Sequence, residues 1–99
     1  MPQSNGNARS MTKLLYSDRF ANDLAGVTST KIERKIFDIL DAVEAAGDIG
    51  SKAVPESIRS EFGEGVRKLA VNPFDLVYTY DAERDIAFIE ALIHQRAAW

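Results

Sequence analysis

The pattern of hydrophobic and polar positions predicts helices in the first half of the chain and strands in the second. Residues 12–16 form a short strand candidate, and Ser17 is then the predicted N-cap of a short helix with a narrow apolar face. Gly26 is the predicted end of this helix. The short interval before the next helical pattern indicates an antiparallel pair of helices.

The second helical pattern is longer than the first. It starts at Thr30, where residues 30–33 fit a capping box, and it stops at Gly47. Its charged face is expected to be solvated. Its apolar residues recur at helical spacing and are expected to be buried against a sheet: Ile32, Ile36, Phe37, Ile39, Leu40 and Val43.

The second half of the chain predicts three strands. An irregular stretch comes first, with a one- or two-turn helix expected over residues 56–62 and Pro55 at its first position. Residues 66–71, 74–80 and 86–96 are then rich in β-branched and aromatic side chains, with short turns between them. One stripe of the middle strand is expected to be core: Phe74, Leu76, Tyr78 and Tyr80.

The predicted order of elements is β-α-α-(short α)-β-β-β. This order indicates an α+β fold in which an N-terminal strand and a helical hairpin pack on an antiparallel β-sheet. Residues 11–99 form the one domain that a chain of 99 residues allows. Residues 1–10 are polar and are expected to be a disordered leader, and Met1 and Met11 both remain candidate starts.

The last strand is apolar on both sides. Period-two alternation puts Ile86, Phe88 and Leu92 on one face of the sheet and Ile89 and Ile93 on the other. A single helical hairpin covers one face only. The second face is therefore expected to be covered by a segment of a partner protein or by a second copy of the chain.

The composition of the chain argues against several classes of protein, including nucleic-acid-binding and membrane-spanning proteins. The net charge of −3 argues against a broad nucleic-acid-binding surface, because such surfaces are usually basic. The chain has no cysteine and one histidine, so disulfides, thiolate chemistry and a histidine-based metal site are not expected. No apolar run reaches the roughly 20 residues that span a bilayer, and residues 1–10 lack the apolar core of a signal peptide. A cytoplasmic protein without membrane association is expected.

The candidate chemistry lies at the end of the last strand. His94 and Arg96 are two residues apart, so strand alternation puts them on one face. His94 is either an acid–base or partner-binding group, or a strand-end histidine packed beside an aromatic ring. Arg67 and Arg96 either form a basic cluster or make separate surface ion pairs, each with Glu64 or Glu90 as a possible partner. We favour the ion pair for Arg67 and the cluster for Arg96.

Three segments carry a resemblance to a known family: Gly65-Val-Arg-Lys-Leu, Phe74-Asp-Leu-Val-Tyr78 and Ala91-Leu-Ile-His-Gln-Arg96. In these segments and in the order of its elements, the chain resembles the RelE/ParE superfamily of bacterial toxins over residues 11–99. The resemblance implies a toxin that a cognate antitoxin neutralises, often within plasmid-stabilisation systems. RelE-like members cut mRNA in the ribosomal A site, whereas ParE-like members poison DNA gyrase.

The residues of this chain match the typical site residues of the two branches at some positions and not at others. Asp75 stands where the RNase branch typically has an arginine on the scissile phosphate, and a carboxylate there repels a phosphate. Lys68 corresponds to a basic residue of the preceding strand, and Arg96 matches an arginine common to both branches. Trp99 occupies the tail where some RNases carry a tyrosine, and an indole cannot act as a general acid at neutral pH.

The sequence thus favours a ParE-like, gyrase-directed toxin without nuclease activity, metal or cofactor. The alternatives are a ribosome-dependent mRNA endonuclease and a non-toxic protein-binding module of the same fold. A homodimer and a toxin–antitoxin hetero-oligomer are both compatible with this interpretation. We expect an antitoxin segment to bind the face of His94 and Arg96, where Phe88 and Leu92 supply apolar contact. The candidate target- or antitoxin-binding residues are Arg67, Lys68, Phe88, Leu92, His94 and Arg96.

Overall fold

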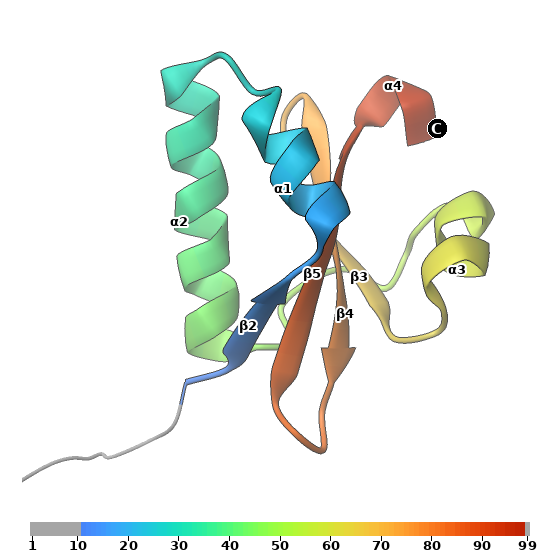
Figure 1. The fold of residues 1–99 in the computed structure, drawn as a ribbon. Coiled ribbons are helices and arrows are strands. Elements are labelled where there is room, and N and C mark those ends of the chain that lie inside the picture. The colour runs from blue at the N-terminus through green and yellow to red at the C-terminus, as the bar shows by residue number, and fades with distance from the viewer. Residues whose placement is uncertain (1–10, 99) are drawn as a thin grey trace, which may run out of the picture.

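The structure, a computed structural model, describes residues 11–98, and the predicted leader and Trp99 lie outside this range. Its elements follow the predicted order (Figure 1). The helices are α1 (Asp18–Ala25), α2 (Thr30–Ala46), α3 (Glu56–Phe62) and α4 (Gln95–Ala98). The strands are β2 (Lys13–Tyr16), β3 (Val66–Val71), β4 (Phe74–Asp81) and β5 (Ile86–His94).

The four strands form one mixed sheet in the order β2-β5-β4-β3. The meander β3-β4-β5 is antiparallel, as predicted, but β2 pairs with β5 in parallel. The predicted antiparallel sheet is therefore confirmed for the meander, and the first strand joins it in parallel. The reason is the crossover: the chain leaves β2, passes through the helices to the opposite edge of the sheet and returns by way of the meander.

Asp85 fastens β2 to the turn between β4 and β5. Its backbone carbonyl accepts the N–H of Lys13 at 3.0 Å, and its Oδ1 accepts the hydroxyls of Thr12 and Tyr80, each at 2.7 Å. The hydrogen bond from Tyr80, followed by the one from Thr12, lowers the pKa of the Asp85 carboxyl. Asp85 adopts a φ of 55°, a left-handed conformation that aspartate tolerates better than most residues.

Local signals predicted the helix boundaries with two errors, each of one residue. Ser17 caps α1 by accepting the N–H of Phe20, and Gly26 and Gly47 end α1 and α2 as predicted. The N-cap of α2 is Ser29, which accepts the N–H of Ile32 at 3.2 Å, so the capping box predicted at Thr30 is one residue late. Pro55 likewise precedes α3 as its N-cap rather than occupying the first helical position.

The helical hairpin of α1 and α2 covers one face of the sheet (Figure 1). Ile36, Leu40 and Val43 of α2 are buried, and Ile32 and Ile39 pack against them. Phe37 is the exception, because 47% of its surface is exposed and it lies outside this core. The predicted core stripe of β4 is confirmed: Leu76 and Tyr78 are fully buried, and Phe74 and Tyr80 pack against the cluster.

Helix α3 covers part of the other face. Ile58 of α3 forms a second buried cluster with Val66 of β3 and Val77 of β4. Part of the second face of the sheet is thus covered by α3 of the same chain, whereas the sequence predicted a partner segment or a second copy there. Phe88, which remains 37% exposed, lies outside this cluster.

A β-bulge in β5 reassigns the faces of the last strand. Val77 pairs with Ala91, but the next residue, Tyr78, pairs with Ile89, so Glu90 is skipped in the register. Residues on either side of the bulge therefore exchange faces. Ile89 and Leu92 both join the core under the helical hairpin, although strict alternation assigned them to opposite faces.

Helix α1 satisfies the backbone groups at the bulge. The hydroxyl of Ser17 donates to the carbonyl of Glu90 at 2.7 Å, and the N–H of Leu92 donates to Oδ2 of Asp23 at 3.0 Å. These two polar side chains take the place of a neighbouring strand, because β2 pairs with β5 only as far as Ile89. The position of α1 is thereby fixed to the irregularity in β5.

We expect Ile36→Ala to lower the free energy of unfolding by about 2–5 kcal/mol, because it opens a cavity at a fully buried position of the core. Urea denaturation measures the change. Phe37→Ala is the matched control on the same helix and should cost less, and equal losses at the two positions would contradict the packing described here.

We expect Asp23→Ala to lower the free energy of unfolding by about 1–3 kcal/mol, because it leaves the N–H of Leu92 without its acceptor. Asp23→Asn keeps an oxygen acceptor and should recover most of this loss in the same denaturation assay. An asparagine variant as unstable as the alanine variant would show that the hydrogen bond at the bulge is not the cause.

Candidate functional site

Three elements meet in a shallow hollow at the C-terminal end of the described chain. Lys68 comes from β3, Asp75 from β4, and Gln95 and Arg96 from α4. We call this the α4 hollow. It is the place where the structure brings together two of the basic residues that the sequence singled out, Lys68 and Arg96.

A buried carboxylate forms the floor of the α4 hollow. Asp75 is only 2% exposed, and its Oδ2 lies 3.7 Å from Nζ of Lys68. Its Oδ1 accepts a hydrogen bond from Nε2 of Gln95 at 3.2 Å. A buried carboxylate needs partners of this kind, and here they come from the neighbouring strand and from the last helix. Asp75 thus offsets the positive charge of Lys68.

Gln95 attaches α4 to the turn between β3 and β4. Its Nε2 also contacts Oδ1 of Asn72 at 2.8 Å and the carbonyl of Phe74 at 3.4 Å, and its backbone N–H donates to the carbonyl of Pro73 at 2.9 Å. This side chain places the next residue, Arg96, at the rim of the hollow. Gln95 was not predicted as a site residue, because an amide at the end of a strand gives no signal of which groups it will bond.

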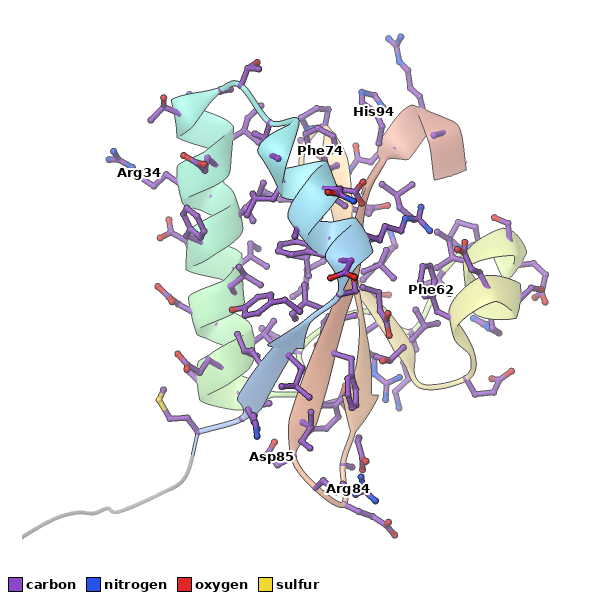
Figure 2. The ribbon with its side chains drawn as sticks, viewed as in Figure 1. Arg34, Phe62, Phe74, Arg84, Asp85 and His94 are labelled. Atoms are coloured by element: carbon purple, nitrogen blue, oxygen red, sulfur yellow. The ribbon has the colours of Figure 1, made fainter. Side chains whose placement is uncertain are left out.

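His94 lies on the other face from Lys68. It pairs with Phe74 across the ladder, and the two rings meet edge to face with centroids 5.7 Å apart. Figure 2 shows the two side chains together at the α4 end of the sheet, away from Arg84 and Asp85 at the far end. The His94 ring therefore packs beside an aromatic ring, as one of the two interpretations expects, and the residue remains exposed.

The predicted shared face of His94 and Arg96 is wrong. Strand β5 ends at His94 and α4 begins at Gln95, so strand alternation does not extend to Arg96. The backbone N–H of Arg96 donates to Nδ1 of His94 at 3.2 Å. Arg96 is exposed and lines the α4 hollow, whereas the His94 ring packs beside Phe74.

Arg67 is a structural residue outside the hollow. It is 9% exposed, and its Nε donates to Oδ1 of Asp48 at 2.8 Å. Arg67 thus makes an ion pair, as favoured, but its partner is Asp48 rather than Glu64 or Glu90, and the pair is partly buried rather than on the surface. The predicted cluster of Arg67 with Arg96 is wrong, because β4 lies between β3 and β5.

Tyr78 holds the loop that brings Asp48 to Arg67. Its hydroxyl donates to the carbonyl of Gly47 and accepts the N–H of Gly50, each at 2.9 Å. Burial raises the pKa of this phenol, and the hydrogen bond from Arg67 lowers the pKa of the Asp48 carboxyl. Asp48 was not predicted as a partner, because only the folded loop brings it to Arg67, 19 residues away in the chain.

Phe88 and Leu92 do not share a surface. Leu92 is 6% exposed and belongs to the core under the helical hairpin, whereas Phe88 is 37% exposed. The bulge at Glu90 separates them, since the two residues lie on either side of the register shift. The predicted patch of Phe88 and Leu92 around Arg96 is therefore wrong.

The α4 hollow offers two cationic side chains, one carboxylate and one amide. Such a set can bind an anionic or polar group, but within residues 11–98 it contains no hydroxyl or thiol nucleophile beside a base. No group of three or more histidine, aspartate or glutamate side chains in this range is arranged to hold a metal ion. None of the helices from Met11 to Ala98 is both long and apolar enough to cross a membrane.

Comparisons with known proteins identify the fold. No protein-family model and no curated protein matches the chain. Among solved structures, it is similar to a chain of the intact Escherichia coli RelBE toxin–antitoxin complex, with a TM-score of 0.63 and 14% identity over 84% of this chain and 95% of that one. A chain of the RelBE2 toxin–antitoxin complex from Mycobacterium tuberculosis gives a TM-score of 0.64 and 15% identity over 88% and 94%.

A third similar structure is a metal-bound toxin from Helicobacter pylori, with a TM-score of 0.55 and 17% identity over 90% of this chain and all of the toxin. The three matches cover nearly the whole length of these proteins, so the likeness concerns the complete fold rather than one motif. At such low identity it establishes the fold alone. The chain has the RelE/ParE-like toxin fold that its sequence resembles.

Proposed function

We propose that the protein is the toxin of a type II toxin–antitoxin pair, acts in the bacterial cytoplasm and is neutralised by a cognate antitoxin protein. The proposal is supported by the fold, which matches two toxin–antitoxin complexes and a further toxin over 84–90% of this chain. The alternative is a non-toxic module of the same fold that still binds a partner protein.

The contact of Lys68 with Asp75 is the observation that argues against nuclease activity. Cleavage of a phosphodiester needs cationic or hydrogen-bonding groups aimed at the charge that develops on the phosphate. In the α4 hollow, a buried carboxylate lies 3.7 Å from the Lys68 ammonium and weakens its field. Arg96 is the other cation that lines the hollow, and the one histidine packs beside Phe74.

We therefore infer a ParE-like mode of action, with DNA gyrase as the target and no chemistry performed by the toxin. The second candidate is ribosome-dependent mRNA cleavage. It is favoured by one observation, the presence of two cations, Lys68 and Arg96, in the same hollow. In the gyrase mode, Arg96 would instead contact a carboxylate or another acceptor on the target protein.

We expect no efficient cleavage of mRNA when the purified protein is added to a reconstituted translation system, because no acid–base set faces a phosphate in the α4 hollow. Primer extension across the A-site codon measures cleavage, and gyrase supercoiling is assayed in parallel. Loss of supercoiling without cleavage is the predicted result. Strong A-site cleavage would contradict the gyrase proposal and support the nuclease candidate.

We expect Asp75→Ala to lower the free energy of unfolding by about 1–3 kcal/mol, because it removes the buried counter-charge of Lys68 and one of the three acceptors that Nε2 of Gln95 contacts. Glu61→Ala removes an exposed ion pair with Arg19 and should cost less than about 1 kcal/mol. Asp75→Asn keeps an oxygen acceptor and should retain both the fold and the toxicity. A stable but inactive asparagine variant would instead give Asp75 a functional role.

A further inference from the structure

A groove at the open edge of the sheet takes no part in the proposed function. It has a volume of about 640 Å³ and lies between β2, α1 and α2. It is distinct from the α4 hollow and shares no residue with it. We call it the edge groove. The residues that carry the argument below are Leu14, Tyr16, Phe20, Phe37, Asp41 and Glu44.

Helix α2 presents a second stripe of side chains to the edge groove. Phe37, Leu40, Asp41 and Glu44 follow the spacing i, i+3, i+4 and i+7, which places them along one side of a helix. Phe37 is 47% exposed, although it is a large aromatic residue beside the core. This stripe explains why Phe37 fits the apolar pattern of α2 without being buried in the core.

The sheet side of the edge groove has unused backbone groups. The N–H groups of Lys13 and Ser17 point inward, because they donate to the carbonyls of Asp85, in the turn before β5, and of Ile89 in β5, each at 3.0 Å. Alternation along a strand then directs the N–H and C=O groups of Leu14 and Tyr16 toward the open edge. An unpaired edge of this kind accepts an added strand.

The apolar surface continues onto the side chains next to this edge. Tyr16 is 54% exposed, and its ring stacks on Phe20 of α1 with centroids 5.8 Å apart. Exposed rings on both walls, Tyr16 on β2 and Phe37 on α2, give an incoming segment apolar contact on either side.

The wall formed by α2 is acidic. Neither Asp41 nor Glu44 makes an ion pair with any residue from 11 to 98. After burial, the charges of Glu44 and Asp41 are the causes that raise the pKa of Tyr16, so their field reaches across the groove. The cation in the groove lining is Lys13, which leaves the carboxylates in excess.

We propose that the edge groove binds an extended, amphipathic segment of a partner protein that adds a strand to β2 and carries lysine or arginine toward Asp41 and Glu44. The identification of this partner with the neutralising antitoxin rests on the proposed function. Apolar side chains of the segment contact Tyr16 and Phe37, and its cations pair with the two carboxylates. An acidic segment meets like charges along the wall of α2 and is rejected.

The test uses the full chain as bait for a phage-displayed library of random 12-residue peptides. Enriched peptides should combine apolar positions with lysine or arginine. Asp41→Lys should weaken the binding of the best synthetic peptide by about three- to tenfold and shift a repeated selection toward acidic residues. The variant should fold, since Asp41 is exposed and makes no ion pair with any residue from 11 to 98.

Asp38→Lys is the matched control. It makes the same charge change on the same helix, but Asp38 lines a different hollow with Lys35 and Ala70. It should leave peptide affinity unchanged. Equal losses at Asp38 and Asp41 would overturn the proposal, because they would reflect net charge alone. Selection of acidic peptides, or of none, would also overturn it.

Amide hydrogen exchange tests the added strand. The N–H groups of Leu14 and Tyr16 should exchange rapidly in the free protein and become protected by the selected peptide. Protection that instead rises with the concentration of the chain alone would identify a second copy as the occupant and overturn the proposal. None of these readouts depends on toxicity. A non-toxic protein that binds cationic peptides in this groove would therefore refute the proposed function and keep this inference.

Discussion

The bulge at Glu90 determines which side chains of β5 lie on each face of the sheet. It is held by two side chains, one from the N-cap of α1 and one from within this helix. Without the skipped residue, Leu92 would lie on the same face as Phe88 and be lost from the core under the helical hairpin. The backbone groups that the bulge leaves over are satisfied by Ser17 and Asp23. A break in the ladder would otherwise cost about 1–3 kcal/mol for each buried polar group without a partner.

The consequences of this bulge extend to both candidate surfaces. Beyond it, β5 continues to His94 and delivers Gln95 to the turn at Asn72 and Pro73, where the α4 hollow forms. Before it, β5 pairs in parallel with β2 and leaves the outer edge of β2 open beside α2. One surface is mainly cationic with a buried carboxylate, and the other is apolar with an acidic wall. The opposite charges of the two surfaces suit them to different kinds of partner.

Signals that act over a few residues were sufficient to predict most of the elements. The cap at Ser17, the ends at Gly26 and Gly47 and the buried stripe of Ile36, Leu40 and Val43 all follow from local geometry. Ser29 and Thr30 are adjacent hydroxyl residues, and propensity does not choose between them as a cap. The parallel pairing of β2 depends on the path of the whole chain, which no short pattern records.

The candidate site was predicted less well, because it depends on where regular structure stops. Strand alternation is valid only while the strand continues, and it failed for Arg96 at the start of α4 and for Leu92 beyond the bulge. The partners of Arg67 and Asp75 come from residues brought close by loops and by α4, namely Asp48 and Gln95. Asp75 was recognised from sequence as an unusual charge, but its burial required the fold.

The central claim, that this fold acts as a toxin on DNA topology rather than on mRNA, is tested most directly by inducible expression in a sensitive bacterial host. Rates of protein and DNA synthesis are followed by pulse labelling, together with a reporter of the DNA-damage response. The account predicts growth arrest in which the damage response rises and DNA synthesis falls before protein synthesis does. Unimpaired growth, or an immediate stop in protein synthesis without a damage response, would contradict it.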